Sequence, residues 1–178
     1  MDRAKISESG HFSNVSIEEI MNFLKGLMRT GAPAATLLIR LVVGGVFVSE
    51  GIQKFLFPGE VGAGRFATIG FSSPDMIALF VGSIEIVCGT LIILGLLTRL
   101  AAIPLIFVML VAIVSTKIPI LLGYQFLGFS LRKVSYYGFW GFMHESRTDL
   151  AMLLSLIFLL IVGAGSISID ARLSGKNE

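Results

Sequence analysis

The sequence contains little of what most site chemistries require. Its 178 residues include one cysteine, Cys88, and two histidines, and only 15% of the residues are charged. One cysteine excludes an internal disulfide, a dithiol redox pair and a four-cysteine metal site. His11 falls in a polar N-terminal stretch, which leaves His144 as the single histidine among the apolar segments. We therefore predict neither a metal site nor a haem site.

Charge of one sign is also scarce. The chain has 14 basic and 12 acidic residues, a formal net charge of +2, and the small basic excess is spread along the sequence. That distribution gives no basis for nucleic-acid binding. Soluble domains carry about 25% charged residues, whereas this chain has only 15%. Its mean hydropathy is +0.87. Its apolar residues come in runs of about 20, which predicts an integral membrane protein.

Four stretches are long enough to cross about 30 Å of hydrocarbon at 1.5 Å per residue. Ser73 and Pro74 are typical of a helix start before the second stretch, and only Thr98 and Arg99 separate the second from the third. The sequence thus predicts an all-α membrane protein with a four-transmembrane-helix bundle in residues 33–170 and a polar tail in residues 171–178. The predicted spans are residues 34–57, 75–97, 100–117 and 148–169.

Residues 1–32 are interpreted as a polar tail followed by a short amphipathic helix. Ser16 and Glu19 fit a capping box, and apolar residues recur on one helical face. Such a helix lies on the membrane surface or docks onto the body of the protein, and both alternatives stay open. We expect no cleavable signal peptide, because the first apolar run starts near Ala34 and is too long for a signal core. The apolar face comprises Ile17, Ile20, Met21, Leu24 and Met28.

The link between the third and fourth spans is unusual. Its first part, IPILLGYQFLGF, is too short and too interrupted by glycine to cross a membrane, which favours an interfacial or re-entrant segment. Its second part is rich in aromatic residues, which suits a belt at the lipid–water interface. Basic residues are nearly balanced between the two faces, but Lys54 and Lys117 lie at span ends and count less. We therefore predict that both termini are cytoplasmic. The aromatic residues are Tyr136, Tyr137, Phe139, Trp140 and Phe142.

Polar residues inside the spans form the first candidate site. Arg40, Glu50 and Lys54 fall within a sector of about 80° on the first span, close to Gly44 and Gly51, which allow another helix to approach.

Glu85 lies near the middle of the second span, and Cα depths make Arg40 its preferred partner and Lys54 the alternative. The set is interpreted either as an ion pair that fixes helix register or as a binding site for a proton, a quinone or a small solute.

A second polar cluster is expected at one membrane face, where the first, third and fourth spans meet. It would bring Lys54 close to five further residues, although ordinary solvation also explains a histidine at an interface. The five residues are Lys117, His144, Glu145, Arg147 and Asp149.

Three stretches resemble the DoxX family of membrane proteins. LLIRLVVGGVFVSEGIQKF is similar to the first helix of that family and VGSIEIVCGTLIILGLLTRLAAIPL to the second. GFWGFMHESRTDLAMLLSLIFLLIVGAGSISID is similar to the last. The resemblance covers residues 34–170 and implies a compact four-helix bundle in a bacterial cytoplasmic membrane. The chain departs from the family where Glu50 replaces a common histidine, and residues 123–137 look like an insertion.

The resemblance also implies a functional range, because some members are associated with quinone-linked sulfur oxidation and others with superoxide-handling or thiol-stress complexes. We predict an accessory or quinone-linked subunit of a membrane redox system that is not catalytic alone. Its expected partners are lipid, other redox subunits and a second copy of the chain. Quinone is the cofactor that we consider for this role, and the sequence identifies no catalytic residue. The alternatives are a small-solute transporter, which would need oligomers, and a structural or assembly subunit.

Overall fold

The computed structural model describes residues 17–175. Ser16 and His11 lie outside this range, so the predicted capping box is untested. Within the described range the chain is helical and has no strand, apart from an isolated bridge between Phe126 and Phe129. The elements are α1 (Ile17–Met28), α2 (Thr36–Leu56), α3 (Ala63–Ile69), α4 (Pro74–Leu94), α5 (Thr98–Ala112), the π-helical turn η1 (Ile113–Lys117), α6 (Ile118–Leu122), α7 (Phe139–Val162) and α8 (Ile169–Leu173).

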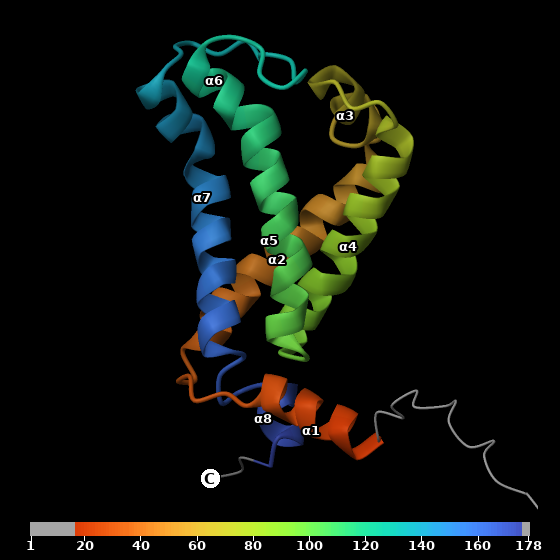
Figure 1. Cartoon of the computed structure of the whole chain (residues 1–178), viewed down its shortest axis with the longest axis vertical. Coiled ribbons are helices and arrows are strands. Elements are labelled where there is room, and N and C mark those ends of the chain that lie inside the picture. The colour runs from red at the N-terminus through yellow and green to blue at the C-terminus, as the bar shows by residue number, and fades with distance from the viewer. Residues whose placement is uncertain (1–16, 176–178) are drawn as a thin grey trace, which may run out of the picture.

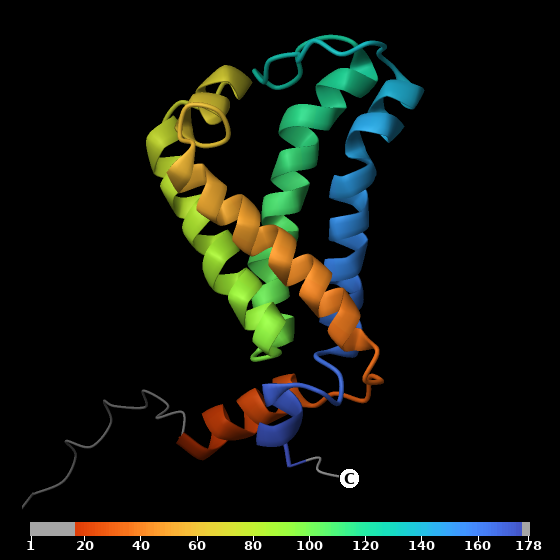
Figure 2. The ribbon, with the colours of Figure 1, turned by 180° about the vertical axis from the view of Figure 1, so that it is seen from behind.

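The long helices α2, α4, α5 and α7 form the body of the molecule (Figure 1). Helix α2 packs mainly against α4, and α5 packs against α7 and α4. Helices α1 and α8 lie together across one end of this body, while α3 and the loop after α6 cover the other end (Figures 1 and 2). A buried apolar core joins the long helices at Val43, Phe47, Ile92, Ala101, Ala102, Leu105, Met109, Met152, Leu156 and Leu159.

Within residues 17–175, three helical stretches are long and apolar enough to cross a membrane. They are α2, α4 and the continuous helix Thr98–Leu122 formed by α5, η1 and α6. Helix α7 differs because Glu145, Arg147 and Asp149 lie in its first half, so its apolar part begins only at Leu150. The structure therefore confirms a helical membrane protein with three candidate spans, and the fourth predicted span is taken up below as a proposal.

Helix α7 is shifted from the predicted fourth span. It begins at Phe139, directly after Gly138 (φ 88°), and ends at Val162, before Gly163 (φ 84°). Positive φ at these two glycines excludes continued right-handed helix and sets both ends. The predicted span, residues 148–169, runs past this break, because the apolar composition continues through the glycine-containing turn into α8.

The third helix also continues beyond its predicted end at Lys117. Pro119 has no N–H to donate and does not stop the helix, because the turn before it is π-helical: the Ile118 N–H donates to the Ile113 carbonyl. Helix α6 then runs to Leu122, and Gly123 (φ 77°) ends it. The interpretation of IPILLGYQFLGF as an interfacial or re-entrant segment is thus wrong for its first five residues, because Ile118–Leu122 extends the third helix. For residues 123–129 it stays a prediction.

Glycines bring α2 and α4 into close contact. A Cβ on Gly44 would lie 2.6 Å from the backbone oxygen of Gly89, and one on Gly51 would lie 2.7 Å from that of Gly82. No methyl group fits at such distances without moving backbone. The predicted close approach of another helix at Gly44 and Gly51 is therefore confirmed, and the partner surface is the glycine pair of α4.

We expect Gly44→Ala to lower the free energy of unfolding by about 1–3 kcal/mol, the usual result of overpacking. Gly45→Ala is the matched control, because a Cβ there meets nothing within 4 Å. The neighbouring alanine should leave stability unchanged or raise it slightly, since alanine favours helix over glycine. Unfolding of both variants by dodecyl sulfate titration in mixed micelles measures the difference. Equal stability of the two variants would contradict the glycine contact.

Candidate functional site

Arg40 is buried, with 2% of its surface exposed, and is bonded to backbone rather than to Glu85. The last four carbonyls of a helix have no partner inside the helix, and Arg40 donates to two of those of α4. It therefore joins the end of α4 to the turn after α7, and the preferred Arg40–Glu85 pairing is wrong. The acceptors are the carbonyl oxygens of Ile92 (2.9 Å), Ile93 (2.6 Å), Ala164 (2.9 Å) and Ile167 (2.6 Å).

Two further charged side chains of the motif-bearing stretches also serve backbone. Asp170 accepts from the N–H groups of Leu97 (2.7 Å) and Thr98 (3.1 Å), and so it caps the start of α5. Arg99 donates to the carbonyl oxygens of Leu160 and Ile161 at the end of α7, and to those of Leu27 and Arg29 at the end of α1. We call Arg40, Arg99 and Asp170 the capping cluster. Its role in the described structure is to hold helix ends together.

Lys54 and Glu85 form the buried ion pair. Lys54 Nζ lies 2.6 Å from Glu85 Oε2, and only 10% and 6% of the two side chains are exposed. Side chains on a helix lean toward its N-terminus, and α2 and α4 are antiparallel, so Lys54 and Glu85 lean toward each other. The same lean carries Arg40 away from Glu85, toward the end of α4. The predicted alternative, Lys54 as partner of Glu85, is confirmed.

Glu50 lies at the edge of this pair. Its carboxylate is 3.9 Å from Lys54 Nζ, but 48% of its side chain is left uncovered by protein, so it does not point into the bundle as expected. Lys54 Nζ also lies 3.4 Å from the Glu50 carbonyl oxygen. Glu50 is thus the accessible carboxylate and Glu85 the enclosed one, with one ammonium between them.

The predicted membrane-face cluster separates into pairs. Lys117, which is buried, pairs with Asp149 at 3.2 Å. A ring nitrogen of His144 lies 3.2 Å from Arg147 on the same helix. Glu145 pairs with Arg132, a residue the sequence analysis did not single out. Lys54 is engaged with Glu85 rather than with this group, so the two predicted clusters are distinct sites.

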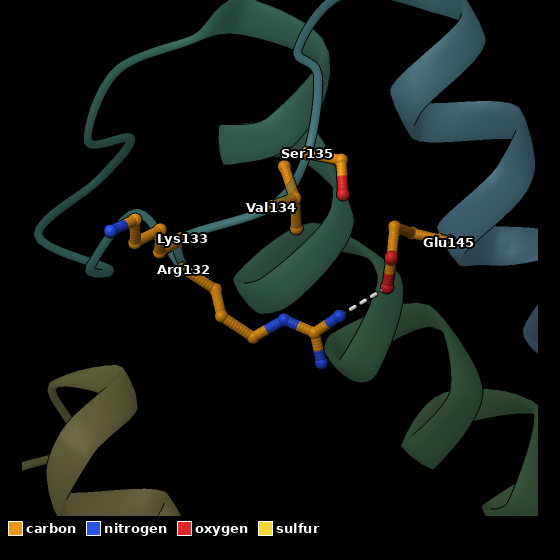
Figure 3. Close-up of a pocket in the computed structure, with 5 residues that line it drawn as sticks. All are labelled: Arg132, Lys133, Val134, Ser135 and Glu145. Carbon is orange, nitrogen blue, oxygen red and sulfur yellow. Dashed lines mark hydrogen bonds and ion pairs between the residues drawn. The ribbon is translucent and has the colours of Figure 1, made fainter.

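A cavity of about 120 Å³ lies next to the Lys117 pair. Its wall is formed by α3, η1 and the 130–132 segment, and it holds three cationic side chains, Arg65, Lys117 and Arg132. Beside it is a shallow open depression, where Arg132 extends to Glu145 of α7 while Lys133 leaves the loop in another direction (Figure 3). Sequence reasoning missed Arg65 and Arg132 because both lie in the links between spans, and only the fold brings them to Lys117.

Comparison with known proteins identifies a matching family and several relatives. The profile of the DoxX family matches residues 35–118. The chain is 51% identical over 150 residues to "Uncharacterized membrane protein Rv3486" of Mycobacterium tuberculosis, covering 84% of this chain and 88% of the relative. It is 35% identical to an "Uncharacterized protein" of Haemophilus influenzae, covering 78% and 90%, and 26% identical to "Putative oxidoreductase CatD" of Bacillus subtilis, covering 76% and 84%. No solved structure matches the chain. The long, well-covered match at 51% identity and the family profile together show that this chain belongs to the DoxX family of membrane proteins.

Proposed function

We propose that this protein is a membrane subunit of a redox system and that it binds a quinone head group beside Lys54 and Glu85. The observation that carries the proposal is the buried ion pair itself. Replacing such a pair by apolar residues is often neutral or stabilising, so its presence in a membrane helix favours a role other than stability. The name of the Bacillus subtilis relative, "Putative oxidoreductase CatD", supports a redox function.

The residues fit a quinone head group in their donor chemistry. The Lys54 ammonium has three N–H groups, enough to serve Glu85 and still donate to a quinone carbonyl. Glu50, uncovered and 3.9 Å from Lys54 Nζ, leaves the edge of the pair accessible to a ligand. A bound quinone would supply two-electron chemistry, and the electrons would come from a partner subunit. The protein would bind and orient the ring and move protons.

Binding of decylubiquinone to the purified full chain tests this function. We expect saturable binding by wild type and at least a tenfold loss in the double variant Lys54→Met/Glu85→Leu, which removes a charged hydrogen bond to the ligand. The control is Asp75→Asn, which changes an exposed residue of α4, the helix that carries Glu85. This variant should bind quinone as wild type does. Equal binding by the double variant, or no binding by wild type with its co-purified partners, would refute the quinone site.

A structural or assembly role is the second candidate, and the capping cluster favours it. Arg40, Arg99 and Asp170 are three of the charged residues in the stretches that resemble the family, and all three bond to backbone at helix ends. On this view the protein holds other membrane subunits and carries no ligand. The double variant Lys54→Met/Glu85→Leu tests this view. If it keeps its stability and still recovers its partner proteins, a structural role predicts that the cells show no change in phenotype.

For the membrane arrangement, we propose four spans, with α7 as the fourth, in the bacterial cytoplasmic membrane. The end with α1 and α8 would face the cytoplasm. The exposed apolar side chains of α1, Ile20, Met21 and Phe23, would lie in the lipid interface beside the protein contacts that α1 already makes. With Cys88 replaced, a single cysteine at Ser9 should react only after the cells are opened, and one at Ser130 should react in intact cells. The reverse pattern would overturn this orientation.

A further inference from the structure

The cavity between α3, η1 and the 130–132 segment is chemically distinct from the Lys54–Glu85 pair. Three cations line it, one each from α3, η1 and the loop, and none of the described residues lining it is acidic. The carboxylates that hold two of these cations come from outside the wall: Asp149 pairs with Lys117 and Glu145 pairs with Arg132. The described lining is therefore cationic, and two of its three cations are held by carboxylates that do not line the cavity.

The hydroxyl groups of the wall add a second requirement for a ligand. Four residues of the wall carry a hydroxyl group. Besides Ser130, they are Thr68, Ser115 and Thr116, which donate their hydrogens to the carbonyl oxygens of Gly64, Val111 and Ala112. These hydroxyls can accept hydrogen bonds but have no hydrogen left to donate. A ligand that satisfies the cations and these three hydroxyls carries anionic oxygens for the former and an O–H group for the latter.

The backbone at the cavity is also unusual. Ser115, Thr116 and Lys117 all belong to the π-helical turn, and such turns within α-helices occur frequently at functional sites. The neighbouring aromatic side chains are exposed, with Tyr136, Tyr137, Phe139 and Trp140 all at least 44% exposed. Tyrosine and tryptophan in such positions mark the level of the lipid head groups. At that level of the membrane, phosphate is available both as the free ion in water and in lipid head groups.

We propose that this cavity binds a phosphate group that also carries a hydroxyl, either hydrogen phosphate or the phosphoglycerol head group of an anionic lipid. Arg65 and Arg132 make the charge-assisted contacts from the exposed side, and Lys117 makes one from the buried side. The site shares none of the residues varied in the quinone test, although the charge of Arg65 acts on Glu85. Its failure and the failure of the quinone proposal are therefore separate results.

Isothermal titration calorimetry of the full chain in a neutral detergent tests the site with four probes. These are inorganic phosphate, sulfate, dioctanoyl phosphatidylglycerol and dioctanoyl phosphatidylcholine, all at pH 7. We expect saturable binding of phosphate, of phosphatidylglycerol or of both, each tighter than its partner probe that lacks a hydroxyl. Tighter phosphate binding assigns the site to the free ion, and tighter phosphatidylglycerol binding assigns it to lipid. Sulfate equal to phosphate, phosphatidylcholine equal to phosphatidylglycerol, or no binding overturns the proposal.

Variants locate the binding. Arg65→Gln and Arg132→Gln should each weaken binding about tenfold, because each removes a charge-assisted hydrogen bond. Arg132→Lys should retain part of it. Lys133→Gln is the matched control: it removes an adjacent positive charge whose side chain points away from Arg132 (Figure 3). An equal loss in Lys133→Gln would show general charge attraction and refute the site. Thermal unfolding of each variant, measured first, confirms that the binding data come from folded protein.

Discussion

Replacing Arg40 by methionine is expected to lower the free energy of unfolding by about 4 kcal/mol, one of the two largest effects in this protein. A buried carbonyl left without its donor costs about 1–3 kcal/mol. Arg40 donates to four carbonyls, of which Ile93 and Ile167 are partly exposed and Ile92 also accepts from the Gly95 N–H. Partial relaxation of the turn after α7 would recover some of that sum. An effect of this size is exceptional for a single substitution. Dodecyl sulfate titration of purified protein, followed by circular dichroism, measures it.

Two further variants test whether the loss of stability comes from the hydrogen bonds of Arg40. Arg40→Lys should lose most of the same stability, because an ammonium cannot reproduce the planar fork of the guanidinium toward carbonyls from two segments. Arg172→Met, in the exposed part of α8, should change stability by no more than about 0.5 kcal/mol. Stability of Arg40→Met equal to that of Arg172→Met would contradict the role of Arg40 as a bridge between helix ends.

Removing Lys54 alone is expected to cost about 3–5 kcal/mol, because it leaves the buried Glu85 carboxylate without its cation. Removing both charges together in Lys54→Met/Glu85→Leu should return stability to near that of wild type, since well-packed apolar residues often replace a buried ion pair at little cost. The double-mutant cycle therefore predicts strong non-additivity. Unfolding free energies of the wild type, both single variants and the double variant, measured in the same micelles, complete the cycle.

Additive losses in that cycle would contradict the direct pairing of Lys54 with Glu85. Glu50→Gln serves as the control on the same helix. Because 48% of the Glu50 side chain is uncovered by protein, its loss should change stability by less than about 1 kcal/mol. The double variant is also the one proposed for quinone binding. A stable fold with lost binding would separate the two roles of the pair.

Most of the fold could be predicted from the sequence, because long apolar runs and glycine-marked ends are local signals. The errors occurred where a local signal had two meanings. Apolar composition does not distinguish a helix from the apolar turn after it, so the predicted last span missed the break at Gly163. A proline normally ends a helix, and Pro119 did not, because the π-helical turn before it changes the bonding that its ring would have disrupted.

The candidate site could be predicted only in part. Helical periodicity placed Lys54 and Glu85 near each other, but Cα depths alone favoured Arg40 as the partner. Gly44 and Gly51 on α2 and Gly82 and Gly89 on α4 share a spacing of seven residues, and this register, with the lean of side chains, would have selected Lys54. The phosphate cavity was out of reach, because Arg65 and Arg132 come from links whose paths depend on tertiary packing.

The bonds of Arg40 have a consequence for how the chain is made. Arg40 lies in the first membrane helix, yet two of its acceptors, Ala164 and Ile167, come 124 and 127 residues later. Chains are synthesised from the N-terminus at about 5–20 residues per second, so these partners are made roughly 6 to 25 seconds after Arg40. During that interval the first helix carries an incompletely bonded cation. The same late segment brings Asp170 to the start of α5, so one final event during biogenesis completes the two helix ends that meet at the turn between α4 and α5.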